Sequence, residues 1–279
     1  MNKNYKIIVI LSGFLITIIL GLILRLQRPL HPNIILITVD ALRADHLGCY
    51  GYQRNTSPTI DKLAKAGIVF LNCFATGSDT VYSFASIFTG KYLGIDKGYV
   101  FLDNILDKRF TTLAEYLKDF SYYTAGFFIN PVLKVGKGFE QGFDYYSGDW
   151  IGTPKMTARV IDFLNNYRGN KPLFIWIHYI DPHAPYLPPE DYFKIFDNDK
   201  LYKKDDKILE LAPEYISNIF TSRGYIPKIV FQKNKYNLNY YIACYDAEIR
   251  YTDFYIGELL KNIKDNTLII LSADHGESL

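Results

Sequence analysis

Two aspartates and one histidine in this sequence stand where they could bind a metal ion. Asp274 and His275 come just after an apolar, β-branched run at residues 267–272, and Asp40 follows a similar run at residues 34–39. Runs of this kind are typical of buried strands in a parallel sheet. Open α/β sheets bind their ligands at the carboxyl ends of the strands. Because carboxylate oxygens and imidazole nitrogens are common metal ligands, the pattern predicts a metal site at this edge.

The rest of the chain alternates predicted strands and helices around these two segments. Ser57 with Pro58 is typical of a helix start, and Thr112 with Glu115 matches a capping box. Alternation of this kind predicts an α/β fold with a mostly parallel central sheet and helices on both faces. The charged segment 197–235 is expected to be an inserted loop or a small helical excursion at the rim. Besides the two strands above, we expect strands at 122–128 and 173–178, and helices at 57–67, 80–90, 153–165 and 239–264.

The amino-terminal segment is typical of a membrane anchor. Residues 7–24 contain no charged side chain, and Lys3 and Lys6 precede them while Arg25 and Arg28 follow. As a helix this segment would be roughly 27 Å long, close to the hydrocarbon thickness of a bilayer. No small-residue cleavage site follows it, so an uncleaved signal anchor is favoured over a removed signal peptide. We therefore expect residues 1–31 to be a transmembrane anchor and linker. The domain that follows, residues 32–279, is expected outside the cytoplasm.

The overall charge argues against one class of partner. The formal net charge is only +2, and clusters such as residues 203–206 mix both signs. A nucleic-acid-binding face needs a concentrated basic stripe, which this sequence does not show. We therefore expect no nucleic acid partner.

Four segments, in order along the chain, resemble the sulfatase family of the alkaline phosphatase superfamily. They are PNIILITVDALRADHL at 32–47, TVYSFASIFTG at 80–90, DPHAPY at 181–186, and YDAEIR at 245–250 followed by DHGE at 274–277. The resemblance implies an alkaline phosphatase-like α/β fold. It also implies one divalent metal ion, held by Asp40, Asp274 and His275 together with the nucleophile.

The nucleophile position departs from the pattern of that family. Sulfatases carry a cysteine, converted to formylglycine, in a Cys-x-Pro-Ser-Arg pattern ten residues before the glycine that corresponds to Gly90. In this chain that position is Thr80, so no formylglycine is expected. A threonine there resembles the superfamily's metal-dependent phosphotransferases and phosphodiesterases, which include phosphoglycerol and phosphoethanolamine transferases. Thr80 is therefore expected to be both nucleophile and metal ligand, although a threonine at a helix start is also a common N-cap.

Further positions of the resemblance concern substrate and metal choice. His183 resembles the family's substrate-binding histidine, and His178 is a candidate second contact, with a structural role for each as the alternative. Ala41 replaces a second acid that many sulfatases carry, and Phe84 replaces an arginine. Fewer oxygen ligands favour zinc or manganese over calcium, with magnesium also possible.

These observations predict a membrane-anchored, metal-dependent enzyme that hydrolyses or transfers a sulfate or phosphate ester. Phosphoryl transfer through Thr80 is the preferred reaction, and a cell-envelope glycan or lipid is a candidate substrate. One alternative is a true sulfuric ester hydrolase that works without formylglycine. Another is a non-catalytic, glycan-binding protein, which Ala41 and Phe84 motivate. The last residues fall within the second metal motif, so we expect the sequence to be a fragment whose catalytic domain continues beyond Leu279.

Overall fold

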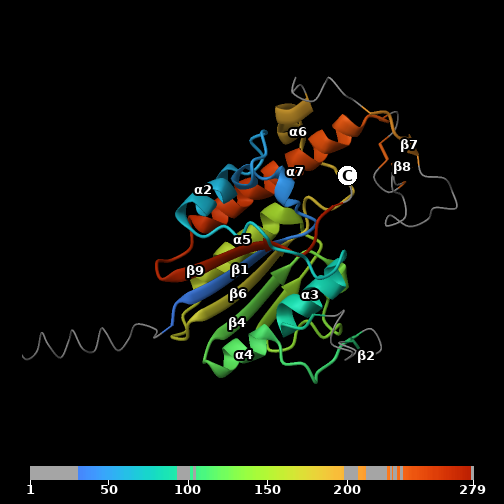
Figure 1. Ribbon diagram of the computed structural model, residues 1–279. Coiled ribbons are helices and arrows are strands. Elements are labelled where there is room, and N and C mark those ends of the chain that lie inside the picture. Colours follow the sequence, from blue (N-terminus) through green and yellow to red (C-terminus); the bar gives the residue numbers. More distant parts are fainter. Residues whose placement is uncertain are drawn as a thin grey trace, which may run out of the picture.

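The computed structural model describes residues 31–92, 101–102, 105–197, 207–211, 225–226, 228, 231–232 and 235–277. In these ranges the protein is a three-layer α/β structure, with a twisted sheet between two layers of helices (Figure 1). The expected α/β architecture with helices on both faces is confirmed. The predicted membrane anchor at 7–24 lies outside the described residues. Within the described part, no helix combines the length and apolar character needed to cross a membrane.

The central sheet has five parallel strands in the order β5-β4-β6-β1-β9. β1 is flanked on one side by β6 and on the other by β9, with Val39 opposite both Tyr179 and Ala273. The residues that follow these strands therefore meet at one edge of the sheet. Strand β5 was not predicted from the sequence. The bounds are β1 (Asn33–Val39), β4 (Tyr123–Phe128), β5 (Tyr145–Gly148), β6 (Leu173–Tyr179) and β9 (Thr267–Ala273).

Alternate residues of the central strands pack against different helix layers. Ile35 and Ile37 of β1 belong to the core beneath the α5–α7 layer, whereas Leu36 belongs to the core beneath α3 and α4. Such alternation follows from the two-residue period of a strand. Figure 1 shows α3 and α4 on one side of the sheet and the other helices on the opposite side. The helices are α2 (Pro58–Ala66), α3 (Thr80–Thr89), α4 (Leu113–Asp119), α5 (Gly152–Asn166), α6 (Glu190–Asp197) and α7 (Leu238–Leu260).

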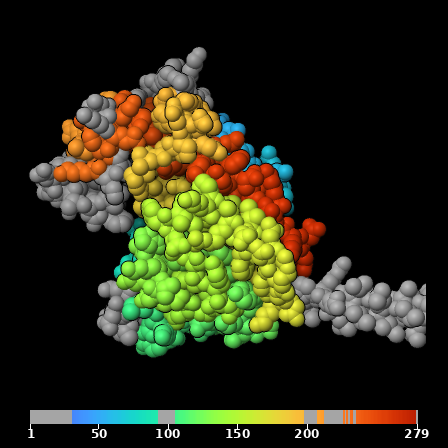
Figure 2. Space-filling model, turned by 180° about the vertical axis from the view of Figure 1, so that it is seen from behind, coloured from blue at the N-terminus to red at the C-terminus, as the bar shows by residue number. Residues whose placement is uncertain are grey.

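Helix α6 extends the layer that contains α7. Phe196 packs against Ala243 and Ala247 of α7. Figure 2 shows the gold atoms of α6 against the orange and red atoms of α7. Shorter elements lie outside the main sheet, and β7 and β8 fall within the predicted insertion, most of which is not among the described residues. They are β2 (Phe101–Leu102), β3 (Ile105–Leu106), β7 (Glu210–Leu211), β8 (Tyr225–Ile226), η1 (Ala44–His46), η2 (Gly48–Tyr50) and η3 (Pro131–Leu133).

The expectation that the last strand is buried is wrong. β9 is parallel to β1 as predicted, but it is one of the two edge strands of the sheet as described. Its side chains therefore alternate between packed and accessible positions, and Leu268 and Ile270 are 51% and 42% exposed. An apolar run alone cannot distinguish a central strand from an edge strand, because both can be rich in branched side chains.

Helix starts show where tertiary contacts replace local capping. α2 begins at Pro58 as predicted, but the side chain of Ser57 makes no capping bond. Instead, Asp253 of α7 accepts hydrogen bonds from the backbone N–H groups of Thr59 (3.0 Å) and Ile60 (2.8 Å). The predicted capping box of α4 is confirmed, since the side chains of Thr112 and Glu115 each accept from the other's backbone N–H.

Candidate metal centre and nucleophile

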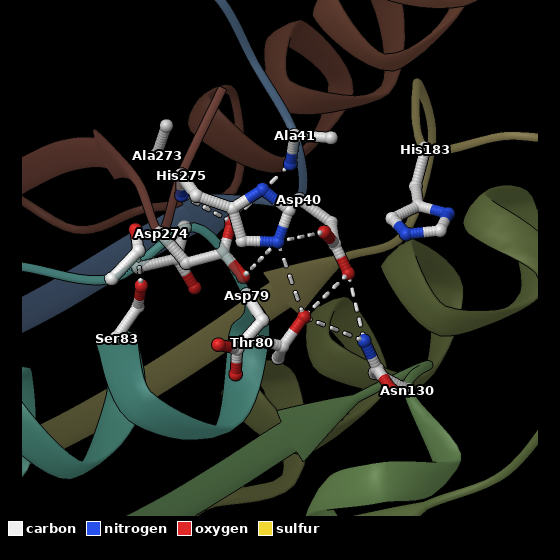
Figure 3. Close-up of polar contacts among 12 residues, drawn as sticks. Asp40, Ala41, Asp79, Thr80, Ser83, Asn130, His183, Ala273, Asp274 and His275 are labelled. Carbon is white, nitrogen blue, oxygen red and sulfur yellow. Dashed lines mark hydrogen bonds and ion pairs between the residues drawn. The ribbon is translucent and has the colours of Figure 1, made fainter. Parts of the chain in front are cut away.

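Four strand and helix ends bring the candidate site residues together at the carboxyl edge of the sheet. Asp40 follows β1, Asp274 and His275 follow β9, and Asn130 follows β4. Thr80 is the first residue of α3, whose amino-terminal end faces the same edge (Figure 3). Because β1 is hydrogen-bonded directly to β9, Asp40 and Asp274 become neighbours despite their separation in sequence.

Each carboxylate has one oxygen already hydrogen-bonded and one without a partner. Oδ2 of Asp40 accepts from the Asn130 amide at 2.7 Å, and Oδ1 of Asp274 accepts from the backbone N–H groups of Ala41 (3.2 Å) and His275 (2.8 Å). Among the described residues, Asp40 Oδ1 and Asp274 Oδ2 are buried and have no hydrogen-bond partner. Buried carboxylate oxygens left in this state are costly unless a cation binds them.

The imidazole of His275 faces these two free oxygens. Its Nε2 lies 3.4 Å from Asp40 Oδ1 and 3.6 Å from Asp274 Oδ2. Its Nδ1 lies 2.8 Å from the carbonyl oxygen of Gly276. A carbonyl can only accept, so Nδ1 carries the hydrogen, and in the neutral ring Nε2 has the free lone pair. This arrangement of a histidine is the one that metal sites use.

Thr80 presents its hydroxyl to the same point. Its Oγ1 lies 3.4 Å from His275 Nε2 and 3.5 Å from Asp40 Oδ2. The N-cap interpretation of Thr80 is wrong, because the N-cap is Asp79, whose side chain accepts from the Tyr82 N–H at 3.1 Å. The Thr80 hydroxyl is therefore not used to start the helix. It remains able to coordinate a cation or to attack a substrate.

The two other predicted site histidines, His178 and His183, differ in how deeply they are buried. His178, on β6, is fully buried, with Nε2 3.4 Å from Asp40 Oδ2 and Nδ1 3.1 Å from the Thr38 hydroxyl. It lies behind Asp40, and its ligand atom is close enough to those of Asp40 and Asp274 for the three to form a metal-binding group. This burial gives the predicted substrate contact of His178 no support.

His183 lies on the more accessible side of the site. Its ring centre is 6.3 Å from that of His275, and its Nδ1 is 2.7 Å from the carbonyl oxygen of Ala184. In Figure 3 the ring lies beside Asp40 and is separate from the group around Thr80. A role in substrate binding stays a prediction.

Burial and neighbouring charges move the two carboxyl pKa values apart. Burial raises the pKa of Asp274, and the negative charge of Asp40 raises it further. Burial also acts to raise the pKa of Asp40, but the nearby imidazoles of His178, His183 and His275 outweigh it and hold that pKa below its ordinary value. Two adjacent buried acids with diverging pKa values are typical of a functional site.

The two departures noted in the sequence have structural explanations. Ala41 is fully buried and left-handed (φ 55°), and its N–H donates to Asp274. The hydroxyl of Tyr245 donates to the Ala41 carbonyl oxygen at 2.7 Å and so supports this turn. Phe84 is also fully buried, with its ring against those of Trp176 and His178 (centres 4.9 and 4.7 Å apart). It is a packing residue behind the site.

Asn130 is the site residue that the sequence reasoning missed. Its amide nitrogen donates to Asp40 and lies 3.4 Å from Thr80 Oγ1. A signal was available, because this polar residue, followed by Pro131, comes two positions after the end of the predicted strand at 122–128. Polar residues at the carboxyl ends of parallel strands are candidates for the ligand edge of an α/β sheet.

The family profile described as "Sulfatase" matches residues 32–279. The N-acetylglucosamine-6-O-sulfatase of Bacteroides thetaiotaomicron is 29% identical over 189 residues, which are 60% of this chain and 34% of that protein. The chain thus spans about a third of this relative's length.

Several solved structures share the fold, including the three that follow. The phosphonate monoester hydrolase of Agrobacterium radiobacter has a TM-score of 0.69 at 21% identity, covering 89% of this chain and 63% of that one. The C-terminal periplasmic domain of EcEptC from Escherichia coli, in complex with Zn, has a TM-score of 0.60 at 18% identity (88% and 64% covered). A Vibrio parahaemolyticus protein of the alkaline phosphatase superfamily has a TM-score of 0.59 at 18% identity (89% and 55% covered). The fold is alkaline phosphatase-like, and the chain belongs to the sulfatase family.

Proposed function

We propose that this protein is a metal-dependent enzyme that cleaves or transfers a sulfate or phosphate ester, with phosphoryl transfer through Thr80 as the preferred reaction. One observation carries the proposal. The Thr80 hydroxyl, which plays no part in capping its helix, faces the buried carboxylate of Asp40 and the Nε2 of His275, the residue next to the second buried carboxylate, Asp274. A hydroxyl nucleophile needs such a setting, because it is weak at neutral pH unless its alkoxide is stabilised.

The donor atoms fit one divalent metal ion. Two buried carboxylate oxygens without partners, the Nε2 of His275 and the Oγ1 of Thr80 converge at separations of 3.4–3.6 Å for the pairs measured. Four ligands that include a nitrogen suit zinc, and manganese also accepts imidazole and carboxylate. Calcium prefers six to eight oxygens, so this set favours it less. The zinc in one structural neighbour supports the same choice.

The residues around Thr80 supply positioning and charge. When bound, the metal would stabilise the Thr80 alkoxide and draw electron density from the ester. Asp40 Oδ2, 3.5 Å from Thr80 Oγ1, is within reach to receive the hydroxyl proton. The amino-terminal end of α3 presents the positive end of its dipole to an ester anion at this place. His183 would contact the anion's outer oxygens from the more accessible side.

Hydrolysis of a sulfuric ester is the second candidate reaction. The similarity to a curated N-acetylglucosamine-6-O-sulfatase favours it, and it points to a sulfated glycan as the substrate. The absence of a cysteine at position 80 favours phosphoryl chemistry instead. Relative rates on a sulfate ester and a phosphodiester with the same leaving group separate the two reactions.

We also propose that residues 1–31 anchor the enzyme in a membrane, with the catalytic domain 32–279 outside the cytoplasm. The uncharged run at 7–24 between basic residues supports this arrangement. Cell-envelope glycans and lipids would then be accessible substrates. Digestion by an external protease tests the orientation, and a domain cleaved only after lysis would reverse it.

Substitution of Thr80 tests the proposed reaction. Thr80→Ala should abolish turnover of a phosphodiester by the full chain, because the attacking oxygen is removed. Thr80→Ser should retain part of the activity, because it removes only a methyl group. Thr89→Ala is the matched control, since Thr89 is at the other end of α3 and its hydroxyl bonds to the backbone of Ala85. Wild-type turnover by Thr80→Ala would exclude Thr80 as nucleophile and leave a metal-bound water as the attacking group.

A further inference from the structure

The side chain of Asn130 joins the two residues on which the proposed reaction depends. It is buried at the start of the η3 turn, with 7% of its surface exposed. Its Nδ2 lies 2.7 Å from Asp40 Oδ2 and 3.4 Å from Thr80 Oγ1 (Figure 3). A carboxamide nitrogen carries two hydrogens, so one group can serve both oxygens at once.

The direction of this amide is determined by its other end. Asn130 Oδ1 accepts a hydrogen bond from the backbone N–H of Val132 at 3.1 Å. A reversed amide would direct its NH₂ group at that N–H, placing two donors against each other, and its oxygen at the carboxylate of Asp40. The hydrogen-bonding pattern therefore requires the amide nitrogen to face Asp40 and Thr80.

This contact determines which oxygen of Asp40 is available. Oδ2 accepts a hydrogen bond from Asn130 and also lies 3.4 Å from the imidazole of His178. Oδ1 accepts no hydrogen bond from the described residues and lies 3.4 Å from Nε2 of His275. A carboxylate held in this way offers Oδ1 to a cation more readily than Oδ2, because the hydrogen bond orients Oδ2 toward the amide and uses one of its lone pairs. Asp274 is restricted in the same manner, although there the backbone N–H groups of Ala41 and His275 occupy one oxygen. For Asp40, the donor is a side chain that substitution can remove.

We propose that Asn130 is a positioning residue that limits Asp40 to coordination through one oxygen and thereby makes the site selective for zinc over calcium. The inference rests on the proposed function, because it concerns the same metal centre. Zinc is satisfied by four ligands, each from one atom. Calcium needs more oxygens and often takes both from one carboxylate. Releasing Asp40 Oδ2 should therefore weaken the preference for zinc.

Two substitutions separate the amide donor from the turn that it starts. Asn130→Ser keeps an oxygen that can accept from the Val132 N–H, but its side chain is too short to reach Asp40. Asn130→Asp keeps the shape and that acceptor but replaces the donor with a carboxylate oxygen. Tyr146→Phe is the control, because the Tyr146 hydroxyl donates to the Leu133 carbonyl at 2.7 Å and supports the same turn without contacting the site.

The measurement is the affinity of the full chain for Zn²⁺ and for Ca²⁺, each titrated alone by calorimetry into metal-free protein. Asn130→Ser should bind zinc about 10- to 100-fold more weakly, the usual effect of losing a group that orients a ligand. Calcium binding should fall less, so the ratio of the two affinities shifts toward calcium. Asn130→Asp should shift the ratio in the same direction, because it adds an oxygen. Tyr146→Phe should match the wild type in both affinities.

The inference is overturned if both Asn130 variants keep the wild-type ratio of zinc to calcium affinity, even where both affinities fall together. It is also overturned if Tyr146→Phe shifts the ratio as much as Asn130→Ser. Disturbance of the η3 turn, and not loss of the amide donor, would then explain the shift. A wild-type chain that binds no divalent metal overturns the proposed function itself. This result differs from a metal-binding wild type whose Asn130 variants are unchanged, which rejects only the role of Asn130.

Discussion

At the scale of residues, the candidate site is defined by which atoms are already bonded and which are free. The carboxylates of Asp40 and Asp274 each have one buried oxygen without a partner in the described structure, and both free oxygens face His275 Nε2. The hydrogen bond from His275 Nδ1 to the Gly276 carbonyl leaves the lone pair of Nε2 free to bind a cation. The residue types alone would not show which oxygen of each carboxylate is free, because either oxygen can bind a metal.

Substitution of Asp274 tests the free oxygen directly. Asp274→Asn keeps an oxygen for the N–H groups of Ala41 and His275, but it replaces the free anionic oxygen with a neutral amide nitrogen. We expect zinc affinity, measured by calorimetry, to fall by about tenfold or more, because a neutral amide is a poorer ligand. Asp265→Asn, at an exposed position before β9, is the control. Unchanged zinc binding by Asp274→Asn would contradict this ligand assignment.

At the scale of elements, strand and helix ends decide which groups are left for chemistry. α3 begins at Thr80, but its capping bond comes from Asp79, so the threonine hydroxyl is not needed for the helix. α2 shows the reverse case, since its first N–H groups are bonded by Asp253 of α7 and not by the neighbouring Ser57. Both results follow from the need to satisfy the first backbone N–H groups of a helix, whichever acceptor lies closest.

The division of roles between Asp79 and Thr80 can be measured as stability. Asp79→Ala should lower the free energy of unfolding by about 1 kcal/mol, because it removes the cap of α3. Thr80→Ala removes a hydroxyl that does not cap, so it should have a smaller effect in urea denaturation of metal-free protein. A larger loss of stability in Thr80→Ala than in Asp79→Ala would show that the threonine, and not the aspartate, caps the helix.

At the scale of the whole molecule, the long helix α7 ties the helix layer to the rim of the site. Its Glu248 accepts from the backbone N–H of Leu187 at 2.7 Å, while its other carboxyl oxygen is buried without a partner in the described part of the chain. Burial raises the pKa of Glu248 well above its ordinary value, and the nearby Asp181 raises it further. The folded protein therefore holds a proton on Glu248 at pH values where the unfolded chain has lost it.

This difference predicts a pH dependence of stability. Because the folded state binds more protons than the unfolded state, stability should fall as the pH rises above the ordinary pKa of a glutamate and through the raised value. The side chain at position 248 cannot ionise in Glu248→Gln. Between pH 5 and pH 8 the melting temperature of this variant should therefore decline less than that of the wild type, with a difference of about 2 °C or more. Glu258→Gln, in the same helix beside Lys261, is the control. Equal slopes for the wild type and Glu248→Gln would contradict the prediction.

The sequence by itself determined the fold class and which candidate site residues would meet at one edge of the sheet. Apolar runs that end in Asp40 and in Asp274 with His275 identified strands of a parallel sheet, and the carboxyl ends of such strands lie at one edge wherever the sheet forms. Family resemblance added Thr80. These predictions needed only local patterns and one rule of sheet geometry, which is why the observed positions agree with them.

The tertiary structure alone decided the contacts that give those residues their states. The partner of Asp40 is Asn130, 90 residues away in the sequence, and the acceptor for the first N–H groups of α2 comes from α7. The edge position of β9 and the depth of His178 behind Asp40 were likewise set by strand order and packing. Local sequence propensity cannot predict such pairings, because a side chain's hydrogen bonds depend on which distant segments the fold places against it.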